Sequence, residues 1–236
     1  MDSHMKTWLL ITDKAPLRGS LNMAVDEYLF ARARKGDETF LRFYRWEKPT
    51  ASLSYGQEAA RAADLDFCLA NGIDIVRRMT GGKVVLHLSE LTYSLASSDT
   101  ETFTPTLQDS YQLISLALIK GLALMGLSAR LAPASPPTYV RGTMPCFAFP
   151  AKGEVEIGGR KIIGSAQKRT GASFIQHGSI PLDKDETLLK AVARFDAEDT
   201  GVSMTSLSEA LGRPVAFDWA ASRFSLGFSK FFRIKL

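Results

Sequence analysis

The sequence predicts an α+β fold in which helices flank a mixed, mostly antiparallel sheet. Segments with strand patterns group together between helical segments, without the strict alternation of strand and helix that is typical of parallel sheets. The chain has 236 residues, of which 45% are hydrophobic, and it can therefore bury a substantial core. No apolar run in it approaches the roughly 18 residues that a membrane-spanning helix needs.

The first predicted helix covers residues 20–36, where apolar residues recur on one helical face. Ser20 or Asn22 can cap its N-terminus, and Gly36 can end it. The face that we expect to be buried carries Leu21, Ala24, Val25, Tyr28 and Leu29.

Strands and a second helix follow in the first half of the chain. Residues 39–46 and 50–56 have strand patterns and are joined around Pro49. Residues 59–72 favour a helix that stops at Gly72. Further strands are predicted at 73–79, 83–87 and 91–97.

The longest helical pattern covers residues 106–126, with Thr106 and Asp109 as a capping pair and Gly126 as the C-terminal stop. A proline-rich loop occupies residues 133–150. The remaining elements are a short strand at 127–133, a hairpin at 155–169 around Gly158 and Gly159, a strand at 173–182, and helices at 185–194, at 206–211 behind a Ser206-x-x-Glu209 capping box, and at about 215–226.

Charge and cysteine content limit the class of protein. The net charge of +4 permits nucleic acid, an anionic membrane or an acidic protein as partner and does not by itself choose among them. The basic residues are spread along the chain and form no run, so we expect neither nucleic acid nor a membrane as partner. Cys68 and Cys146 do not form a disulfide framework, which favours a reducing cytoplasm. We interpret residues 1–5 as a cloning scar and residues 6–236 as a single domain without a C-terminal accessory domain.

The stretch RRMTGGKVVLH (77–87) places Thr80, Gly81 and Gly82 between two predicted strands. Two adjacent residues without side chains let the backbone approach a ligand closely and adopt positive φ angles. A tight turn between strands is the more common explanation of an isolated Gly-Gly pair. The phosphate-binding patterns GxGxxG and GxxxxGK[ST] are absent here.

A second glycine-containing stretch, GGRKIIGSAQKR (158–169), carries Lys161 three residues before Gly164, Ser165 and Ala166. A strand of such small residues presents bare backbone N–H and C=O groups to its neighbour. The lysine could fix a carboxylate or carbonyl oxygen beside that strand. For this pattern taken alone, a solvated lysine on a hairpin is the simpler explanation.

Cys146 lies in the proline-rich loop, within MPCFAFP, whereas Cys68 falls inside a predicted helix. A thiol on a proline-stiffened loop near basic residues is a candidate nucleophile, although this context alone does not decide it. His87 and His177 could form hydrogen bonds near a site. No group of Cys and His has the spacing of metal ligands, so no metal site is predicted.

Together and in this order, these stretches resemble the signature of the lipoate-ligase and octanoyltransferase family. The matching positions in the first stretch are Arg77, Arg78, Thr80, Gly81, Gly82 and His87. In the second half they are Lys161, Gly164, Ser165, Ala166, Gln167 and Arg169, followed by Gln176, His177, Gly178, Ser179 and Ile180. The segments 21–29 and 41–57 also match, so the resemblance covers residues 6 to about 230.

The resemblance implies the catalytic-domain fold of the biotin and lipoate ligases and transferases. Cys146-Phe147-x-x-Pro150 is similar to the nucleophile loop of the octanoyltransferases. Lys161 is similar to their lysine that stabilises the thiolate and the acyl oxygen. The other matching residues, which the resemblance places around the acyl substrate, are Arg77, Arg78, Thr80, Gly81, Gly82, His87, Gly164, Ser165, Ala166, Gln167, His177 and Gly178.

The activity that the resemblance implies is transfer of an octanoyl group from octanoyl-acyl carrier protein to a lipoyl-carrier protein in lipoate synthesis. The acyl group would pass through a thioester on Cys146 to a lysine of the glycine cleavage H protein or of an E2 lipoyl domain. Such a reaction needs no cofactor and no metal.

Three alternatives stay open. An ATP-dependent lipoate–protein ligase would need ATP and Mg²⁺ but not Cys146. An amidotransferase that moves octanoyl or lipoyl groups between carrier proteins would use the same cysteine. A non-catalytic carrier-binding module would need neither Cys146 nor Lys161, and the presence of both argues against it.

Overall fold

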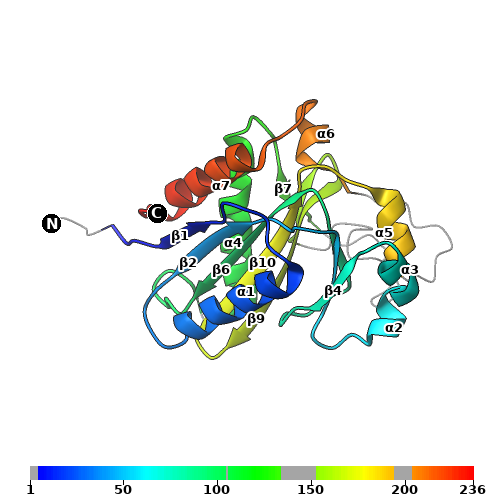
Figure 1. Ribbon diagram of the computed structural model, residues 1–236. Coiled ribbons are helices and arrows are strands. Elements are labelled where there is room, and N and C mark those ends of the chain that lie inside the picture. The colour runs from blue at the N-terminus through cyan, green and yellow to red at the C-terminus, as the bar shows by residue number, and fades with distance from the viewer. Residues whose placement is uncertain (1–4, 105, 134–152, 194–203) are drawn as a thin grey trace.

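The computed structural model describes residues 5–104, 106–133, 153–193 and 204–236, and it contains two sheets (Figure 1). The larger sheet has seven strands in the order β1-β2-β6-β10-β9-β8-β7. Its central strands β6 and β10 pair with each other and are buried along their whole length. In sequence order its strands are β1 (Leu9–Thr12), β2 (Phe40–Tyr44), β6 (Glu90–Ser97), β7 (Arg130–Leu131), β8 (Val155–Ile157), β9 (Arg160–Thr170) and β10 (Ser173–Pro181).

The smaller sheet has β3 (Thr50–Leu53) between β4 (Asp74–Arg77) and β5 (Val85–His87). In each sheet one pair is parallel, β1 with β2 and β3 with β4, and the other pairs among the described strands are antiparallel. The predicted α+β class with a mixed, mostly antiparallel sheet is therefore confirmed.

The strands predicted on either side of Pro49 form as β2 and β3, but they belong to different sheets. The Pro49 carbonyl accepts a hydrogen bond from the Asp74 amide at 2.9 Å, and this bond begins the pairing of β3 with β4. The chain therefore leaves the large sheet at the proline, which has no N–H to donate to a ladder.

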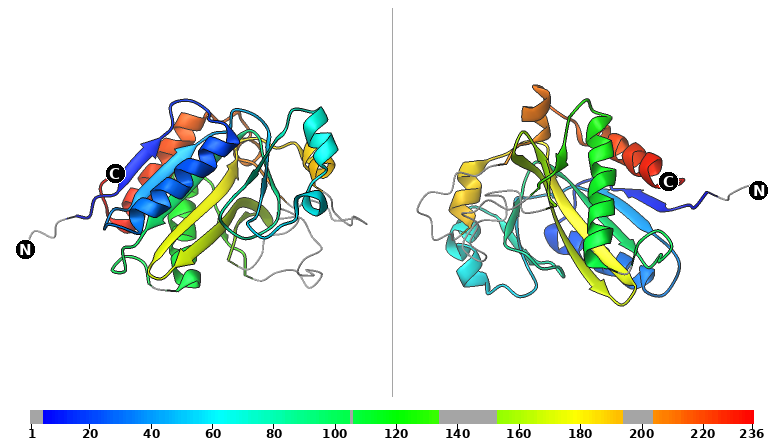
Figure 2. Two further views of the ribbon diagram at one scale, coloured as in Figure 1. Left: turned by 60° about the horizontal axis from the view of Figure 1, so that its bottom comes forward. Right: turned by 180° about the vertical axis from the view of Figure 1, so that it is seen from behind.

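Helices cover both faces of the large sheet (Figure 2). On one face lies α1 (Gly19–Ala33), whose apolar residues contact β2, β6 and β10. On the other lie α4 (Leu107–Ala123) and α7 (Phe217–Phe232), which enclose the main core with the same sheet. The short helices are α2 (Ala59–Ala62), α3 (Leu65–Ala70), α5 (Glu186–Val192) and α6 (Leu207–Leu211). No helix in these described ranges has the length and apolar character needed to cross a membrane.

The buried face predicted for α1 is only partly right, because Leu29 is buried and Val25 packs against the same cluster, but the other predicted residues are exposed. Leu21 is 48% exposed and Tyr28 is 58% exposed, whereas Asn22 and Asp26 are buried. Apolar periodicity fails here because the helix buries two polar residues that bond to Arg42 of β2. The helix starts at Gly19, one residue before the predicted start, but it has no side-chain cap and it stops at Ala33 instead of Gly36.

The single helix predicted at 59–72 is two helices. The break falls at Ala63, which forms an isolated β-bridge with Ala193 beside α5. Asp64 then begins α3, because its side chain accepts a hydrogen bond from the Phe67 amide at 2.9 Å. An N-capping aspartate in the middle of an alanine-rich run thus divides the helix.

Other local signals are confirmed. Thr106 caps α4 by accepting from the Asp109 amide, and Ser206 caps α6 by accepting from the Glu209 amide. The β8–β9 hairpin turns at Gly158 and Gly159, which both have positive φ angles. These motifs are short-range, so their geometry follows from sequence alone.

The last helix is longer than predicted, since α7 continues to Phe232. Its mid-helix glycine, Gly227, lies against Gly121 of α4, and a Cβ atom on Gly227 would come within 2.6 Å of the Gly121 nitrogen. The two glycines therefore let the helix backbones touch. Glycine normally weakens a helix, but here close packing compensates for that weakness.

We predict that Gly227→Ala lowers the free energy of unfolding by about 1–3 kcal/mol, because the added methyl overpacks the α4–α7 contact. Urea denaturation followed by circular dichroism measures the loss. Gly36→Ala is the control, since a Cβ atom there meets nothing within 4 Å. Equal stability of Gly227→Ala and the parent protein would contradict this account of the contact.

Candidate active site

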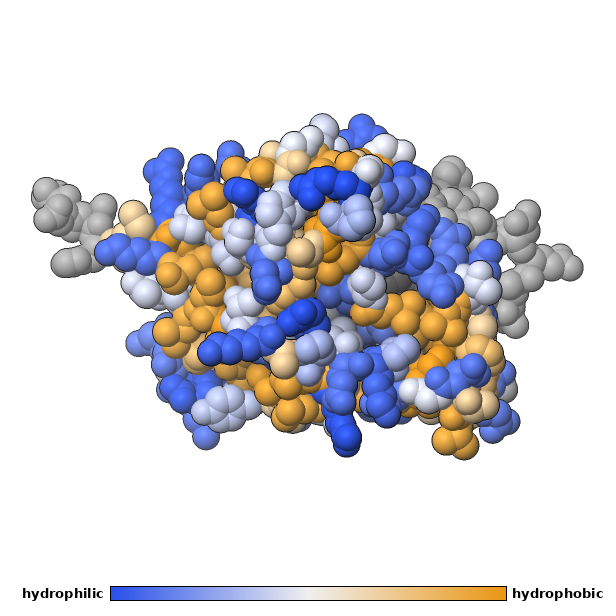
Figure 3. Space-filling model, turned by 45° about the horizontal axis from the view of Figure 1, so that its top comes forward, coloured by the Kyte–Doolittle hydropathy of each residue, from blue (hydrophilic) through white to orange (hydrophobic). Residues whose placement is uncertain are grey.

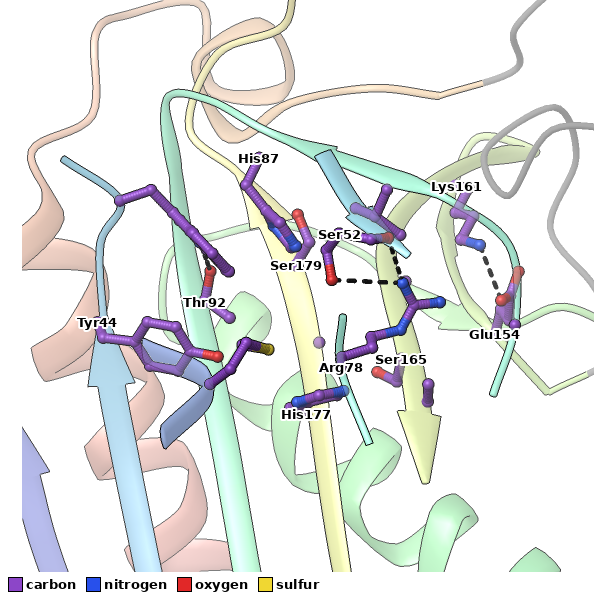
Figure 4. A pocket seen from close by; sticks show the side chains of 17 residues that line it. Tyr44, Ser52, Arg78, His87, Thr92, Glu154, Lys161, Ser165, His177 and Ser179 are labelled. Carbon is purple, nitrogen blue, oxygen red and sulfur yellow. Dashed lines mark hydrogen bonds and ion pairs between the residues drawn. The ribbon is translucent and has the colours of Figure 1, made fainter. Parts of the chain in front are cut away.

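A pocket opens between the large sheet and the small sheet, and it encloses about 520 Å³ of space out to its mouth. In Figure 4, Tyr44 and Thr92 lie on one side of the pocket, and Lys161 and Glu154 lie on the other. Its described lining consists of Met23, Tyr44, Trp46, Ser52, Arg78, Gly82, Val85, His87, Thr92, Glu154, Lys161, Gly164, Ser165, Ala166, His177, Gly178 and Ser179.

Small residues of β9 and β10 make one wall of the pocket. Gly178 pairs with Ser165 across the two strands. A Cβ atom on Gly178 would come within 2.6 Å of the Tyr93 ring and 2.7 Å of the Gly164 carbonyl oxygen. Glycine is required at this position because the neighbouring strands leave no room for a side chain.

The glycine turn wraps around a buried arginine. The Arg78 guanidinium donates hydrogen bonds to the carbonyl oxygens of Ser52 at 2.6 Å, Gly81 at 2.9 Å and Lys83 at 2.6 Å. Gly82 has a φ of 101°, and a Cβ atom on it would lie 2.9 Å from the guanidinium. The Gly-Gly pair thus lets the backbone close over Arg78, which also lines the pocket.

The turn is fixed to the large sheet through His177. Nε2 of His177 lies 2.6 Å from the Thr80 hydroxyl, and Nδ1 lies 3.0 Å from Oδ2 of Asp26. Because an ionised carboxylate only accepts, Nδ1 carries a proton, and in the neutral ring Nε2 accepts from Thr80. Asp26, His177 and Thr80 therefore join α1, β10 and the glycine turn in one chain of hydrogen bonds.

Asp26 is the centre of a buried network. Its Oδ1 accepts from Arg42 at 3.1 Å and from Ser94 at 2.8 Å, and its Oδ2 accepts from Tyr44 at 3.0 Å as well as from His177. Burial and the Asp26 charge raise the pKa of Tyr44 well above its ordinary value. The phenol is therefore a neutral donor throughout the physiological range.

A second buried carboxylate holds His87 at the pocket wall. Glu90 accepts from His87 Nδ1 at 2.8 Å, from Ser179 at 2.7 Å and from the Thr92 hydroxyl. Burial opposes ionisation of Glu90, but the charge of His87 and these hydrogen bonds outweigh it and lower the pKa of the carboxyl group. The His87 ring stacks on Trp46 with centroids 3.9 Å apart, so its orientation is fixed on two sides.

Lys161 of β9 is, after Arg78, a second buried cation of the pocket, with 1% of its side chain exposed. Its ammonium lies 2.8 Å from Oε1 of Glu154, which precedes β8. The strand is held in place at this residue, because the Lys161 carbonyl accepts from the Thr205 amide at 2.9 Å. A buried ammonium needs such a counter-charge to remain ionised.

An ion-pair cluster secures the segment beside Lys161. Glu209 of α6 accepts from Arg160 at 2.5 Å, from Thr205 at 3.0 Å and from Lys184 at 3.2 Å. The hydrogen bond from Arg160 is the largest cause that lowers the pKa of Glu209, to about 2. Within the described part of the chain, no cluster of His, Cys, Asp or Glu has the makeup of a metal site.

Comparison with known proteins decides the family. The chain matches the family described as lipoyl protein ligase A/B catalytic domain over residues 18–229. It is 36% identical to an octanoyltransferase LipM from Kyrpidia tusciae, over 96% of this chain and 87% of that protein. An octanoyltransferase LipM from Clostridioides difficile is 35% identical, over 98% of this chain and 89% of that protein. This chain belongs to the lipoyl protein ligase A/B family.

Solved structures agree with this lipoyl ligase A/B fold. A lipoate-protein ligase A bound with ATP superposes with a TM-score of 0.82 and 25% identity, covering 98% of this chain and 87% of that chain. A structure from the archaeal lipoylation system of Thermoplasma acidophilum, which comprises a bi-partite lipoate protein ligase and its E2 lipoyl domain, has a TM-score of 0.78 and 25% identity, covering 99% of this chain and 86% of that chain.

The pocket of this lipoyl ligase A/B domain contains most residues that the sequence placed around an acyl substrate. Those that line it are Arg78, Gly82, His87, Gly164, Ser165, Ala166, His177 and Gly178, and Lys161, predicted as a catalytic residue, lines it as well. Their roles toward a substrate stay predictions. Cys146, the predicted nucleophile, lies outside the described residues.

Four predicted substrate-binding residues are not part of the described pocket lining. Arg77 instead donates to the carbonyl oxygens of Ser54 and Gln57, both at 2.7 Å, and so holds the loop after β3. Thr80 and Gly81 instead hold the glycine turn in place: the Thr80 hydroxyl bonds to His177, and the Gly81 carbonyl accepts from Arg78. Gln167 points away from the pocket toward α4, because it bonds to Ser110 and Gln176.

Sequence reasoning missed the apolar and acidic parts of the pocket. Met23, Tyr44 and Trp46 make its apolar side, and Glu154 supplies its carboxylate. Glu154 carries no local signal beyond its place just before a strand, because its partner Lys161 meets it only through the hairpin. Asp26 could have been noticed, because it lies four residues after Asn22 on one face of the helix. A search for apolar residues alone passes over this polar pair.

We predict that Asp26→Asn lowers the free energy of unfolding by about 3 kcal/mol, because the buried Arg42 and His177 lose a shared anionic partner. Tyr44→Phe removes one hydrogen bond and should cost about 1 kcal/mol. Urea denaturation measures both. Glu27→Gln, on the exposed side of the same helix, is the control. An Asp26→Asn protein as stable as this control would contradict the role of the network.

We predict that Glu209 stabilises the fold in a pH-dependent way. The pKa of Glu209 is about 2 in the folded protein against an ordinary value of 4.5. Its contribution is therefore fully present above about pH 4.5 and is lost as the pH falls toward 2. The stability difference between the parent protein and Glu209→Gln should shrink over that window. Urea denaturation at several pH values tests this, and a constant difference would contradict the ion-pair cluster.

Proposed function

We propose that this chain is an octanoyltransferase of lipoate synthesis. It moves an octanoyl group from octanoyl-acyl carrier protein through a Cys146 thioester to a lysine of a lipoyl-carrier protein, such as the glycine cleavage H protein or an E2 lipoyl domain. The observation that carries this proposal is the buried Lys161 ammonium in a pocket with a narrow small-residue wall and an apolar side. Relatives over nearly the whole chain are octanoyltransferases, which supports the same reaction.

The pocket fits the two ends of a medium-chain acyl group. The hydrocarbon tail is accommodated on the apolar side, near Met23, Tyr44 and Trp46. The thioester carbonyl then lies toward Lys161, whose ammonium stabilises the negative charge that develops on the carbonyl oxygen during attack. The bare backbone of Gly164, Ser165 and Ala166 lets the chain lie flat against β9.

The proposed chemistry divides one acyl transfer into two steps. In the first step the Cys146 thiolate attacks the thioester carbon of the donor, a new C–S bond forms, and the carrier's thiolate leaves and takes up a proton. In the second step the amine of the acceptor lysine attacks the enzyme thioester, and the Cys146 thiolate leaves. Support for Cys146 comes from the sequence, because Lys161 follows it by 15 residues as the resemblance requires.

The partners and the compartment belong to the same proposal. The chain carries a net charge of +4, which suits encounters with acidic carrier proteins. Cys68 is a buried free thiol, in keeping with a cytoplasmic enzyme. The proposed reaction uses the thioester bond of its donor as the source of free energy, so it requires neither ATP nor a metal ion.

A lipoate–protein ligase is the second candidate, because a solved structure with the same fold is a lipoate-protein ligase A bound with ATP. A ligase would activate free lipoate or octanoate with ATP and Mg²⁺ before transfer to the carrier lysine. It would not use Cys146 as a nucleophile. The two candidates therefore differ in both ATP requirement and cysteine dependence.

We predict one octanoyl adduct on the intact protein after mixing with octanoyl-acyl carrier protein in the absence of ATP. Mass spectrometry detects the adduct, which hydroxylamine should remove. Cys146→Ala should abolish it, and Lys161→Ala should slow its formation at least about 100-fold, as loss of an oxyanion-stabilising group does. Product that appears only with ATP and free octanoate or lipoate would instead make the protein a ligase.

A further inference from the structure

The pocket carries one acid among its described lining residues, and that acid is Glu154. It forms the ion pair with Lys161, but the two partners are not equally buried. The Glu154 side chain is 14% exposed and the Lys161 side chain is 1% exposed. The carboxylate is therefore the member of the pair that a molecule entering from solvent can reach.

The position of Glu154 is fixed by its backbone. Its carbonyl accepts from the Ala132 amide at 2.8 Å, and the Gly153 amide donates to the Ala132 carbonyl at 2.9 Å. These bonds extend the pairing of β7 with β8 by one step. The carboxylate is thus presented from the end of a paired strand, and a site held in this way is well placed to orient a substrate group.

A neighbouring acid shows that this arrangement is specific to Glu154. Glu156 lies two residues further along and is the register partner of Lys161. Its carboxylate nevertheless pairs with Arg130 at 2.7 Å, outside the described pocket lining. Glu154 and Glu156 thus both lie opposite or next to Lys161 on the neighbouring strand segment, but of these two carboxylates only Glu154 belongs to the described pocket lining.

A positive substrate meets an electrostatic problem in this pocket. The acceptor of the proposed reaction is a lysine, which reaches the enzyme as an ammonium ion at neutral pH. It must approach a thioester that lies beside the ammonium of Lys161, and two like charges repel strongly where water is excluded. The Glu154 carboxylate, which is the more exposed member of the pair with Lys161, lowers this barrier because it attracts the incoming ammonium.

We propose that Glu154 is a catalytic residue of the second step, which binds the ammonium of the acceptor lysine and takes its first proton. This inference rests on the proposed transferase function. The carboxylate forms a charge-assisted hydrogen bond to the incoming group beside the pair with Lys161. In this arrangement Lys161 stabilises the charge on the acyl oxygen, and Glu154 binds and deprotonates the acceptor amine.

The protons and electron pairs balance in this step. The acceptor ammonium transfers one proton to the Glu154 carboxylate and becomes a neutral amine. Its lone pair forms the C–N bond to the acyl carbon, and the C–S bond of the enzyme thioester breaks with its electron pair on sulfur. The second amine proton goes to that sulfur as the amide forms. Glu154 then returns its proton to solvent.

A single-turnover experiment tests this role. Octanoyl-enzyme is prepared with octanoyl-acyl carrier protein, desalted, and mixed either with an E2 lipoyl domain or with hydroxylamine, which is uncharged at neutral pH. Mass spectrometry follows the loss of the adduct. In Glu154→Gln the rate with the lipoyl domain should fall at least about tenfold relative to the rate with hydroxylamine, the size of one charged hydrogen bond.

Two further variants sharpen the test. Glu156→Gln is the matched control, and its ratio of the two rates should equal that of the parent enzyme. Glu154→Asp keeps a carboxylate and should retain the parent ratio to within about threefold, even where the overall rate drops or Glu154→Gln fails to acylate. The lysine transfer of Glu154→Gln should also rise with pH more steeply than that of the parent, because deprotonation must then occur in water.

The outcomes separate this inference from the proposed function. An unchanged ratio in Glu154→Gln, with both reactions slowed equally, means that Glu154 merely holds Lys161 and overturns the inference. A Glu154→Asp protein that loses the preference for the lipoyl domain completely overturns it as well. A parent enzyme that never forms the octanoyl adduct contradicts the proposed transferase itself, and the inference falls with it.

Discussion

The carboxylate of Asp26 is the interaction on which the rest of the structure depends. It belongs to the buried face of α1 and accepts hydrogen bonds from side chains of three strands of the large sheet, β2, β6 and β10. A buried charge is costly unless it is fully paired, so these donors must keep fixed positions relative to one another. Through His177 the same carboxylate reaches Thr80. The helix, the large sheet and the glycine turn are thereby set in one arrangement.

The pocket follows from this arrangement. The glycine turn is hydrogen-bonded to His177 of β10 and to the Arg78 guanidinium. These bonds fix its position relative to the small residues of β9, which pairs with β10. Glu90 performs a similar task for His87 on the other side of the pocket. Lys161 lies on β9 and pairs with Glu154, which comes just before β8. Glu209 binds Arg160, the residue next to Lys161, and so helps to hold this hairpin in place. The buried carboxylates of Asp26 and Glu90 therefore fix the shape of the pocket, and the pair of Lys161 with Glu154 supplies the charged groups of the proposed reaction.

Much of this could be predicted from sequence, and the failures have physical causes. Capping motifs at Thr106 and Ser206 and the hairpin at Gly158 depend on neighbouring residues, so local patterns identify them. The buried face of α1 could not be found by counting apolar residues, because Asp26 is buried through partners that are distant in sequence. The pairing of Lys161 with Glu154 likewise depends on hairpin register. Resemblance to a family pointed to Lys161 and the glycine turn, but the bond of Thr80 to His177 depends on a residue 97 positions away and could not be read from the sequence.

The most direct test of the central claim is a crystal structure of the protein after exposure to octanoyl-acyl carrier protein without ATP. The account predicts an octanoyl chain between Gly82 and the wall made by Gly164 and Gly178, with its carbonyl oxygen toward Lys161 and its tail on the side of Tyr44. The turn at Thr80 should keep its contact with His177. An acyl chain bound elsewhere on the molecule, or a pocket that stays empty while the protein carries the adduct, would contradict the account.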